Sequence, residues 1–213
     1  MNTVSRLALA KIKPGMTISL GGGSNVANLA QALAENMVAG IKIVSPSEAT
    51  RTLCHKLQLP FVDWDGTSSI DLAFDGCDSV DLAFHALKSM GGIHFFEKSY
   101  ADCSRQYILL TKAERVQPKL NPDFPLVLEA ADLAVANVVK QAEKLGLRTS
   151  IRSNKTKLGN SLLDLFADSW DQIADWNKEL LQLNGVVSSS YFDQQVTGII
   201  TENGEIAKEV NHD

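Results

Sequence analysis

The sequence has few cysteines, and they are not arranged as a disulfide framework or a zinc site requires. Its 213 residues contain three cysteines, Cys54, Cys77 and Cys103, without a CxxC pair. Disulfide scaffolds and zinc modules need paired, regularly spaced cysteines. The four histidines also lack metal-ligand spacing. We therefore expect no structural disulfide and no metal, and the cysteine usage favours a reducing, cytoplasmic compartment.

Clusters of positive charge and long apolar runs are also missing. The net charge is −5, and no run of five or more Lys or Arg residues occurs. Nucleic-acid binding depends on clustered cations that neutralise phosphates, so we expect no nucleic-acid partner. A small phosphate stays a candidate ligand, because it needs only a few donors. No apolar segment is long enough for a membrane span or a signal core, so we expect no membrane partner.

The first half of the chain alternates strands with helices. Hydrophobic residues make up 45% of the sequence, which suffices for a sizeable core. The apolar patterns predict helices at 4–12, 26–37 and 49–57, and strands at 17–20, 41–44, 59–65, 70–76 and 105–111. This alternation predicts an α/β fold, a Rossmann-like parallel sheet with helices on both faces.

The pattern changes after Pro118, beyond which residues 121–125 form a turn-rich joint. The elements expected there are a strand and a helix ending at Gly146, a helix opened by a Ser169–Gln172 capping box and ending at Gly185, and a strand at 185–192. With a further strand between the two helices, these elements have the order β-α-β-α-β, which predicts a smaller α+β subdomain. Residues 196–210 resemble a hairpin that turns at 202–204.

These patterns predict two domains. Residues 1–124 and 193–213 are assigned to the Rossmann-like catalytic domain, and residues 125–192 to the smaller subdomain.

Four loops follow predicted strands, after Leu20, Val44, Phe74 and Leu110. In parallel α/β sheets, ligands bind outside the carboxyl ends of the strands. The first of these loops, GGGSNVA at 21–27, leads into a helix, whose free N–H groups suit a phosphate. It matches neither the P-loop nor the GxGxxG pattern. The alternative is a tight turn with Ser24 as N-cap.

The loop FDGCD at 74–78 places two carboxylates, Asp75 and Asp78, at a strand end. Two neighbouring carboxylates can differ in pKa, so that one carries a proton while the other stays charged. The alternative is an Asx turn with acids that face solvent. Between two acids the thiolate of Cys77 is disfavoured, so we do not expect a nucleophile there.

Two lysines and a glutamate complete the set of candidates. Lys88 precedes Ser-Met-Gly-Gly, and a cation beside exposed backbone N–H groups can stabilise an oxyanion. Glu97 lies among aromatic residues, which suits a general base with a raised pKa. Lys112 follows another strand. The alternatives are two solvated lysines and an ordinary glutamate in a first helical turn.

Taken in order, these segments resemble one known family, ribose-5-phosphate isomerase of the A type. The similar segments cover nearly the whole chain and are GGGSNVA, VSPSEAT, FDGCD, KSMGG, EK at 97–98, TK at 111–112, LGNSLLDL, NGVVSSSYF and TENGE. The resemblance implies a fold shared with CoA transferases, with a ferredoxin-like second subdomain. It also implies a cytoplasmic homodimer or homotetramer that needs no cofactor or metal.

The resemblance further implies an activity, the interconversion of ribose 5-phosphate and ribulose 5-phosphate through a cis-enediolate. Two alternatives stay open, a non-catalytic sugar-phosphate-binding relative and a deaminase-like enzyme of the same fold. The catalytic residues implied are Glu97 as the proton shuttle, with Asp75, Asp78 and Lys88. The substrate-binding residues implied are Gly22, Gly23, Ser24, Asn25, Gly76, Cys77, Ser89, Met90, Gly91 and Lys112.

One of the departures from the family pattern lies in the loop after Lys88. Ser89 and Met90 stand where the family has glycines. If either position requires a positive φ, the non-glycine residue costs about 1 kcal/mol or more. We also expect Met90 to add bulk near the substrate.

Overall fold

The computed structural model describes residues 1–208, which form two compact units. The first unit contains residues 1–77, 96–115 and 194–208, and the second contains residues 78–95 and 116–193. The division thus assigns 78–95, 116–124 and Asp193 to the second unit, whereas the sequence-based ranges assign them to the first. The domain ranges themselves stay a prediction. No helix among residues 1–208 is long and apolar enough to cross a membrane.

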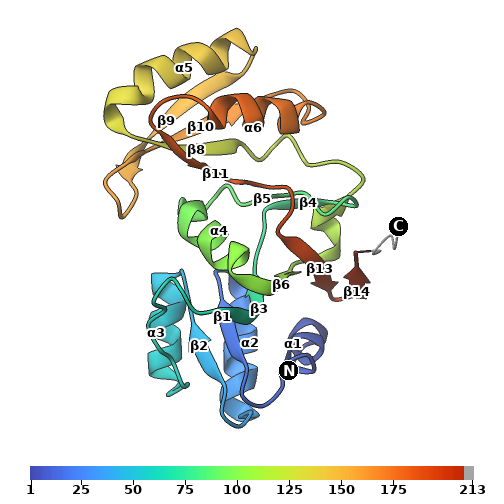
Figure 1. Cartoon of the computed structure of the whole chain (residues 1–213). Helices are drawn as coiled ribbons and strands as arrows, with labels where there is room; N and C mark the ends of the chain where they lie inside the picture. Colours follow the sequence, from blue (N-terminus) through green and yellow to red (C-terminus); the bar gives the residue numbers. More distant parts are fainter. Residues whose placement is uncertain (209–213) are drawn as a thin grey trace. The chain divides into compact units, whose positions relative to one another are not determined.

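A six-stranded sheet forms the centre of the first unit (Figure 1). Its strands, in spatial order, are β14 (Gly204–Ala207), β13 (Val196–Thr201), β6 (Ser104–Leu110), β3 (Ile70–Asp75), β1 (Thr17–Leu20) and β2 (Lys42–Val44). All neighbours pair in parallel except β13 and β14, which form an antiparallel hairpin. The predicted α/β class and parallel sheet are confirmed.

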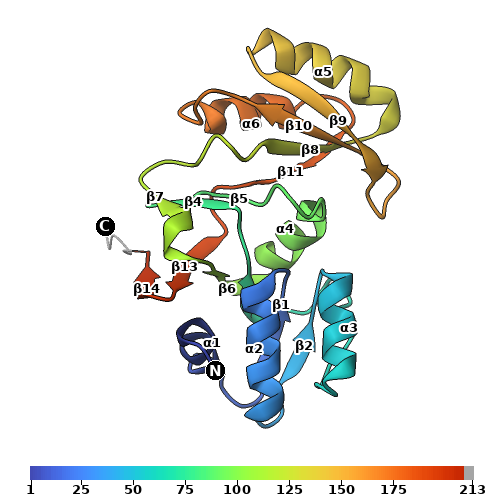
Figure 2. The same cartoon turned by 180° about the vertical axis from the view of Figure 1, so that it is seen from behind.

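Helices lie on both faces of this sheet (Figures 1 and 2). They are α1 (Thr3–Leu9), α2 (Ser24–Glu35), α3 (Glu48–Lys56) and α4 (His94–Asp102), with a 3₁₀ turn η1 at Ala113–Arg115. The main core of the unit joins apolar residues of α1 and α2 to Leu20, Phe74 and Leu110. Successive strand residues point to opposite faces, so Asp75, next to Phe74, points away from this core.

Several local predictions in the first unit are wrong. Residues 59–65 form no strand, because only Phe61 makes an isolated bridge, to Ile43. The N-cap of α2 is Gly23 without a side-chain bond, so Ser24 is not the cap. The helices expected to reach residues 12 and 37 end at Leu9 and Glu35. The predicted hairpin near the carboxyl end is confirmed within residues 196–207; residues 209–210 lie outside the described part.

The second unit contains a ferredoxin-like layer. Its antiparallel sheet has the order β11 (Val186–Ser189), β8 (Leu126–Ala130), β10 (Ser161–Phe166) and β9 (Arg148–Lys155). The helices α5 (Val135–Lys144) and α6 (Ile173–Leu181) and the 3₁₀ turn η2 (Asp132–Ala134) complete the β-α-β-β-α-β order. Both helices pack on one face of this sheet (Figure 1), where Leu128, Val138, Leu163 and Leu180 share a core.

A small second sheet in the same unit carries the loops near Asp78 and Lys88. It joins β12 (Tyr191–Phe192), β5 (Ala86–Leu87), β4 (Ser79–Asp81) and β7 (Val116–Gln117).

Sequence reasoning was less accurate in this unit. It missed the polar strand β9 and the short strands β4, β5 and β7, and it counted one strand too few in the ferredoxin-like layer. The Ser169–Gln172 capping box is wrong, because α6 begins at Ile173 after a Gln172 without a side-chain cap bond, and it ends at Leu181 instead of Gly185. The strand expected over 185–192 divides at Ser190 into β11 and β12.

Candidate functional site

In the first unit, Asp75 collects hydrogen bonds from three donors at the carboxyl end of β3. Its Oδ1 accepts from the backbone N–H groups of Gly22 (2.9 Å) and Gly76 (2.8 Å), and its Oδ2 accepts from the Tyr107 hydroxyl (2.8 Å). Only 2% of Asp75 is exposed. These donors hold the Asp75 carboxylate in one orientation. Asp75 therefore does not lie in the solvent-facing Asx turn considered from sequence.

The Tyr107 hydroxyl interacts electrostatically with both Asp75 and Glu97. Burial, and next the negative charges of Asp75 and Glu97, raise the pKa of Tyr107 well above its ordinary value. The phenol therefore stays protonated and keeps donating to Asp75. Glu97, in the first turn of α4, is 6% exposed, so it is not a solvated surface glutamate. Sequence reasoning missed Tyr107, whose only signal was its place in an apolar strand.

Several hydrogen bonds within the first unit fix the glycine loop between β1 and α2. The Gly21 carbonyl accepts from the Thr50 hydroxyl (2.6 Å), the Gly22 N–H donates to Asp75, and the Asn25 side chain donates to the Leu110 carbonyl (3.2 Å). Asn25 thus joins the loop to the end of β6. Gly23 and Ser24 are exposed.

Arg115, in η1, contacts the turn that contains Cys77. Its Nη1 donates to the Cys77 carbonyl at 2.6 Å. Lys112, which sequence reasoning selected instead, has a side chain 66% exposed and pairs with Glu114 at 3.3 Å. Arg115 is therefore a site candidate that the sequence analysis missed, since its position at the end of a 3₁₀ turn gave no signal.

In the second unit, Asp78 binds the loop that follows Lys88. Its Oδ2 accepts from the backbone N–H groups of Ser89 (2.7 Å) and Met90 (3.0 Å). The Ser89 hydroxyl donates to the Pro125 carbonyl (2.5 Å). The two N–H groups nearest Lys88 are therefore bound by Asp78, whereas the N–H groups of Gly91 and Gly92 donate no hydrogen bond to any residue from 1 to 208.

The two residues that replace family glycines fit their positions. Neither Ser89 nor Met90 has a positive φ, so the backbone cost considered from sequence does not arise. Ser89 is fully buried, and 68% of Met90 is exposed. Within this loop the positive φ belongs to Gly92.

Lys88 is a buried cation, with 6% of the residue exposed. Its N–H donates to the Ser190 carbonyl (3.0 Å), and its Nζ lies 5.9 Å from the centre of the Phe192 ring. A cation over an aromatic face is stabilised by the ring quadrupole. Lys88 is thus held by strand β12 and is not a solvated surface lysine.

Arg152 and Asp164, which sequence reasoning also missed, lie close to the same loop. Arg152 pairs with Asp164, and its Nη2 donates to the Ser89 carbonyl at 2.6 Å. The two residues lie on β9 and β10, twelve residues apart, and only the sheet register brings them together.

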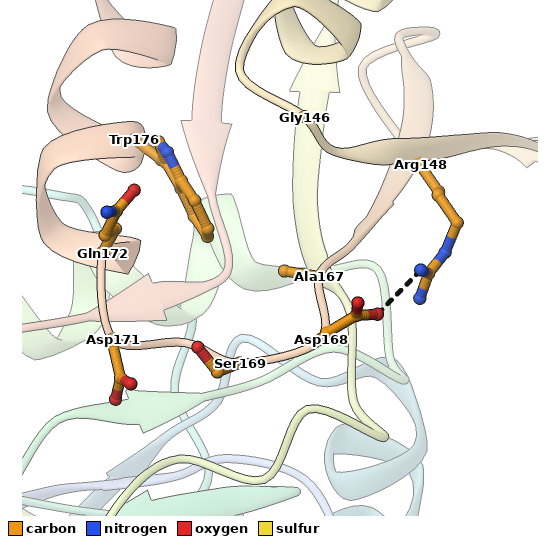
Figure 3. Close-up of a pocket in the computed structure, with 8 residues that line it drawn as sticks. All are labelled: Gly146, Arg148, Ala167, Asp168, Ser169, Asp171, Gln172 and Trp176. Atoms are coloured by element: carbon orange, nitrogen blue, oxygen red, sulfur yellow. Dashed lines mark hydrogen bonds and ion pairs between the residues drawn. The ribbon is translucent and has the colours of Figure 1, made fainter.

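A pocket of about 360 Å³ lies elsewhere in the second unit (Figure 3). Gly146, Arg148, Ser169, Gln172 and Trp176 are among its lining residues. Its one cation, Arg148, is bound to Asp168 at 2.8 Å, as the dashed line in Figure 3 marks. No predicted site residue lines this pocket. No group of three or more His, Cys, Asp or Glu side chains within residues 1–208 is arranged to hold a metal ion.

Comparisons with known proteins agree on one family. Residues 42–205 match the family model of ribose 5-phosphate isomerase A (phosphoriboisomerase A). The ribose-5-phosphate isomerase A of Listeria monocytogenes is 31% identical over 205 residues, which cover 92% of this chain and 91% of that protein.

Solved structures of the same kind resemble the fold closely. Ribose 5-phosphate isomerase A from Methanocaldococcus jannaschii has a TM-score of 0.85 at 25% identity, covering 96% of both chains. A D-ribose-5-phosphate isomerase solved in complex with phospho-erythronic acid has a TM-score of 0.88 at 24% identity, covering 97% of this chain and 96% of that one.

Proposed function

Because this chain belongs to the ribose 5-phosphate isomerase A family, we propose that it interconverts D-ribose 5-phosphate and D-ribulose 5-phosphate in the non-oxidative pentose phosphate pathway. The observation that carries the proposal is the buried cluster of Asp75, Tyr107 and Glu97 in the first unit. Buried, oriented carboxylates are the groups that a proton transfer between adjacent carbons requires.

Glu97 is the proposed proton shuttle. Its carboxylate removes the proton from carbon 2 of the open-chain aldose, and the C–H electron pair forms the double bond of a cis-enediolate. The proton then returns to carbon 1, while the hydroxyl proton on oxygen 2 is lost as that oxygen becomes the ketone and oxygen 1 is protonated. One carboxylate serves both carbons, because the cis-enediolate presents them on one face.

The developing negative charge needs preorganised donors. We assign this role to the buried Lys88 and to the N–H groups of Gly91 and Gly92. These two N–H groups donate no hydrogen bond to another described residue. No metal is required in this scheme, since a cation and amides carry the charge. The scheme therefore predicts turnover in the presence of EDTA.

The remaining candidates bind the substrate or open its ring. We propose that Asp75 and Asp78 act in opening the furanose. We propose that the loop residues Gly22, Gly23, Ser24 and Asn25, the turn residues Gly76 and Cys77, and Ser89, Met90 and Lys112 contact the sugar phosphate. Arg115 joins this set because it binds the Cys77 carbonyl. We further propose that the protein is a homodimer or homotetramer and acts in the cytoplasm.

The test is ribulose 5-phosphate formation from ribose 5-phosphate with EDTA, for the native chain and for Glu97→Gln. We expect kcat to fall roughly 10²- to 10⁴-fold in the variant, the usual contribution of a general base. In D₂O, the native enzyme should incorporate solvent deuterium at carbon 1. Glu143→Gln, which changes an exposed glutamate on α5, is the matched control and should retain native kcat.

Other outcomes separate the alternatives. A native chain without turnover, whose melting temperature still rises with ribose 5-phosphate, would be a non-catalytic binding relative. Release of ammonia from an aminosugar phosphate, without isomerisation, would indicate a deaminase. Isomerisation unaffected by Glu97→Gln would remove this residue from its role.

A further inference from the structure

A single peptide group in the second unit is bound from both sides by opposite charges. The N–H of Met90 donates to Asp78 Oδ2 at 3.0 Å, and the carbonyl of Ser89 accepts from Arg152 Nη2 at 2.6 Å. These two groups belong to the same peptide unit, which is trans, so they point in opposite directions. The peptide between Ser89 and Met90 is therefore clamped between an anion and a cation.

The same guanidinium also contacts the next peptide. Arg152 Nη1 lies 3.4 Å from the Met90 carbonyl oxygen, a longer contact. The N–H on the other side of that peptide is the one of Gly91, which no described acceptor binds. A cation at the carbonyl end directs this N–H away from Arg152. It also polarises the peptide, which strengthens the N–H as a donor.

Arg152 is itself held in place by Asp164. Its Nε lies 2.8 and 3.1 Å from the two carboxylate oxygens, and its Nη2 lies 2.8 Å from Oδ1. The two side chains are 17% and 18% exposed. The planar guanidinium thus binds a carboxylate along one edge and two carbonyls along another. A lysine ammonium cannot reproduce this arrangement.

Gly92 allows the loop to approach these strands. Its φ is +62°, and a Cβ there would lie 2.6 Å from Leu162 Cδ1 and 3.5 Å from Arg152 Nη1. The left-handed conformation favours glycine, and a Cβ would force Leu162 Cδ1 to move. The loop therefore packs against β9 and β10, and Arg152 supplies the polar contacts between them.

We propose that Arg152, held by Asp164, is a positioning residue that orients and polarises the Gly91 N–H toward the substrate oxygen that becomes negative in the reaction. Arg152 acts through the loop and does not contact the sugar phosphate. This inference rests on the proposed isomerase activity and adds two residues that support its oxyanion donors.

The kinetic test compares Arg152→Ala with Arg148→Ala. Arg148 lies on the same strand and pairs with an exposed aspartate, so it is the matched control. We expect Arg152→Ala to lower kcat about 10- to 100-fold, the scale of a misplaced oxyanion donor, with KM changed less than about 3-fold. Affinity for phospho-erythronic acid, whose carboxylate resembles the enediolate, should fall in parallel with kcat. Arg148→Ala should match the native enzyme.

Two further variants guard against a folding artefact. Arg152→Lys keeps the charge and Asp164→Asn keeps the shape, and both should lower kcat while a native-like melting curve is retained. Added guanidinium ion should restore part of the kcat of Arg152→Ala. A kcat that stays native in Arg152→Lys, or falls only in proportion to lost folded protein, would overturn the inference.

The amide signal of Gly91 tests the inference independently of turnover. In a ¹H–¹⁵N spectrum of the whole chain, Arg152→Lys should shift the Gly91 proton upfield, and Arg148→Ala should leave it in place. An unmoved Gly91 signal refutes the inference even where the enzyme is active. A native chain without isomerase activity refutes the proposed function instead, whatever the spectrum shows.

Discussion

Two glycine-containing loops of this molecule are each bound by an aspartate, but in different ways. In the first unit, Asp75 holds the loop at Gly22 from within a buried strand and receives a phenol from Tyr107. In the second unit, Asp78 holds a loop with an exposed residue, Met90, and Arg152 binds the same peptide from the opposite side. The first loop is bound by a buried aspartate that has neutral donors, and the second is bound by opposite charges.

The difference follows from where each loop lies. The first directly continues β1, whose residues are packed in the sheet, so steric fit restricts it. The second lies between a two-residue strand and a helix, and so has little regular structure of its own. A backbone segment of this kind stays ordered when its carbonyl and N–H groups have strong partners. Steric changes should therefore disrupt the first loop, and changes of charge the second.

The largest effect is expected from Gly21→Ala. A Cβ at this position would overlap the Asp75 carboxylate, so Asp75 must move and lose its donors. We expect turnover to fall more than about 100-fold and the free energy of unfolding to fall by about 1–3 kcal/mol. Gly22→Ala is the control for folding only, because no described atom beyond its chain neighbours lies within 4 Å of the added carbon. An equal loss of unfolding free energy in the two variants, measured by thermal melting, would contradict the steric account.

A smaller effect is expected from Asp78→Asn. The amide removes the negative charge opposite Arg152 and weakens the bonds from the N–H groups of Ser89 and Met90. We expect kcat to fall about 10- to 100-fold and stability to fall by about 1–3 kcal/mol, the scale of hydrogen bonds to a charged group. The matched control is Asp168→Asn, an exposed aspartate side chain in the same unit. A change in salt concentration should alter the effect of Asp78→Asn on kcat and should have little influence on the effect of Gly21→Ala.

Tyr107→Phe should have a more moderate effect. The variant removes one of three donors to Asp75 and keeps the ring packing, so we expect a loss of about 1 kcal/mol in stability and roughly a 3- to 10-fold fall in kcat. Because the pKa of Tyr107 lies well above its ordinary value, the hydroxyl stays protonated through neutral pH. The ratio of native to variant kcat should therefore be constant from about pH 6 to 9. A ratio that changes tenfold in this interval would show that another group titrates.

Met90→Gly should have the smallest effect. Met90 is exposed and lacks a positive φ, so glycine relieves no strain and adds freedom to the unfolded chain. We expect kcat within about 3-fold of native and a stability loss of about 0.5–1 kcal/mol. A kcat that rises tenfold in a steady-state assay would instead mean that Met90 obstructs the substrate.

The sequence predicted the fold best where a strand is short, apolar and followed by a glycine turn. β1 and β3 were found for this reason, and their carboxyl ends indicated the first loop and Asp75. β6 was found from its apolar run alone, because residues 111–120 contain no glycine. Strand β9 was missed because Arg148–Lys155 is polar and mostly exposed, as suits an edge strand. The strand predicted at 59–65 does not form, because Pro60 and nearby aspartates interrupt the apolar run. Only one bridge, at Phe61, remains in this segment.

The site was predictable only in part, for a related reason. Asp75, Asp78 and Lys88 were predicted because each lies near a glycine-containing turn. Tyr107 and Arg152 reach their partners through sheet register, which a linear sequence does not display. Tyr107 lies 32 residues from Asp75 and Arg152 lies 12 residues from Asp164, so no local pattern revealed these contacts.

The order of strands in the six-stranded sheet of the first unit affects how the chain folds during synthesis. Strand β6 ends at Leu110, and its neighbour β13 begins at Val196, after the whole second segment of the other unit. While residues 111–195 emerge from the ribosome, one edge of β6 has no strand to pair with. An unpaired edge is a template for wrong association. The nascent chain is therefore most exposed to misassembly in this interval, and the arrival of the carboxyl-terminal hairpin ends it.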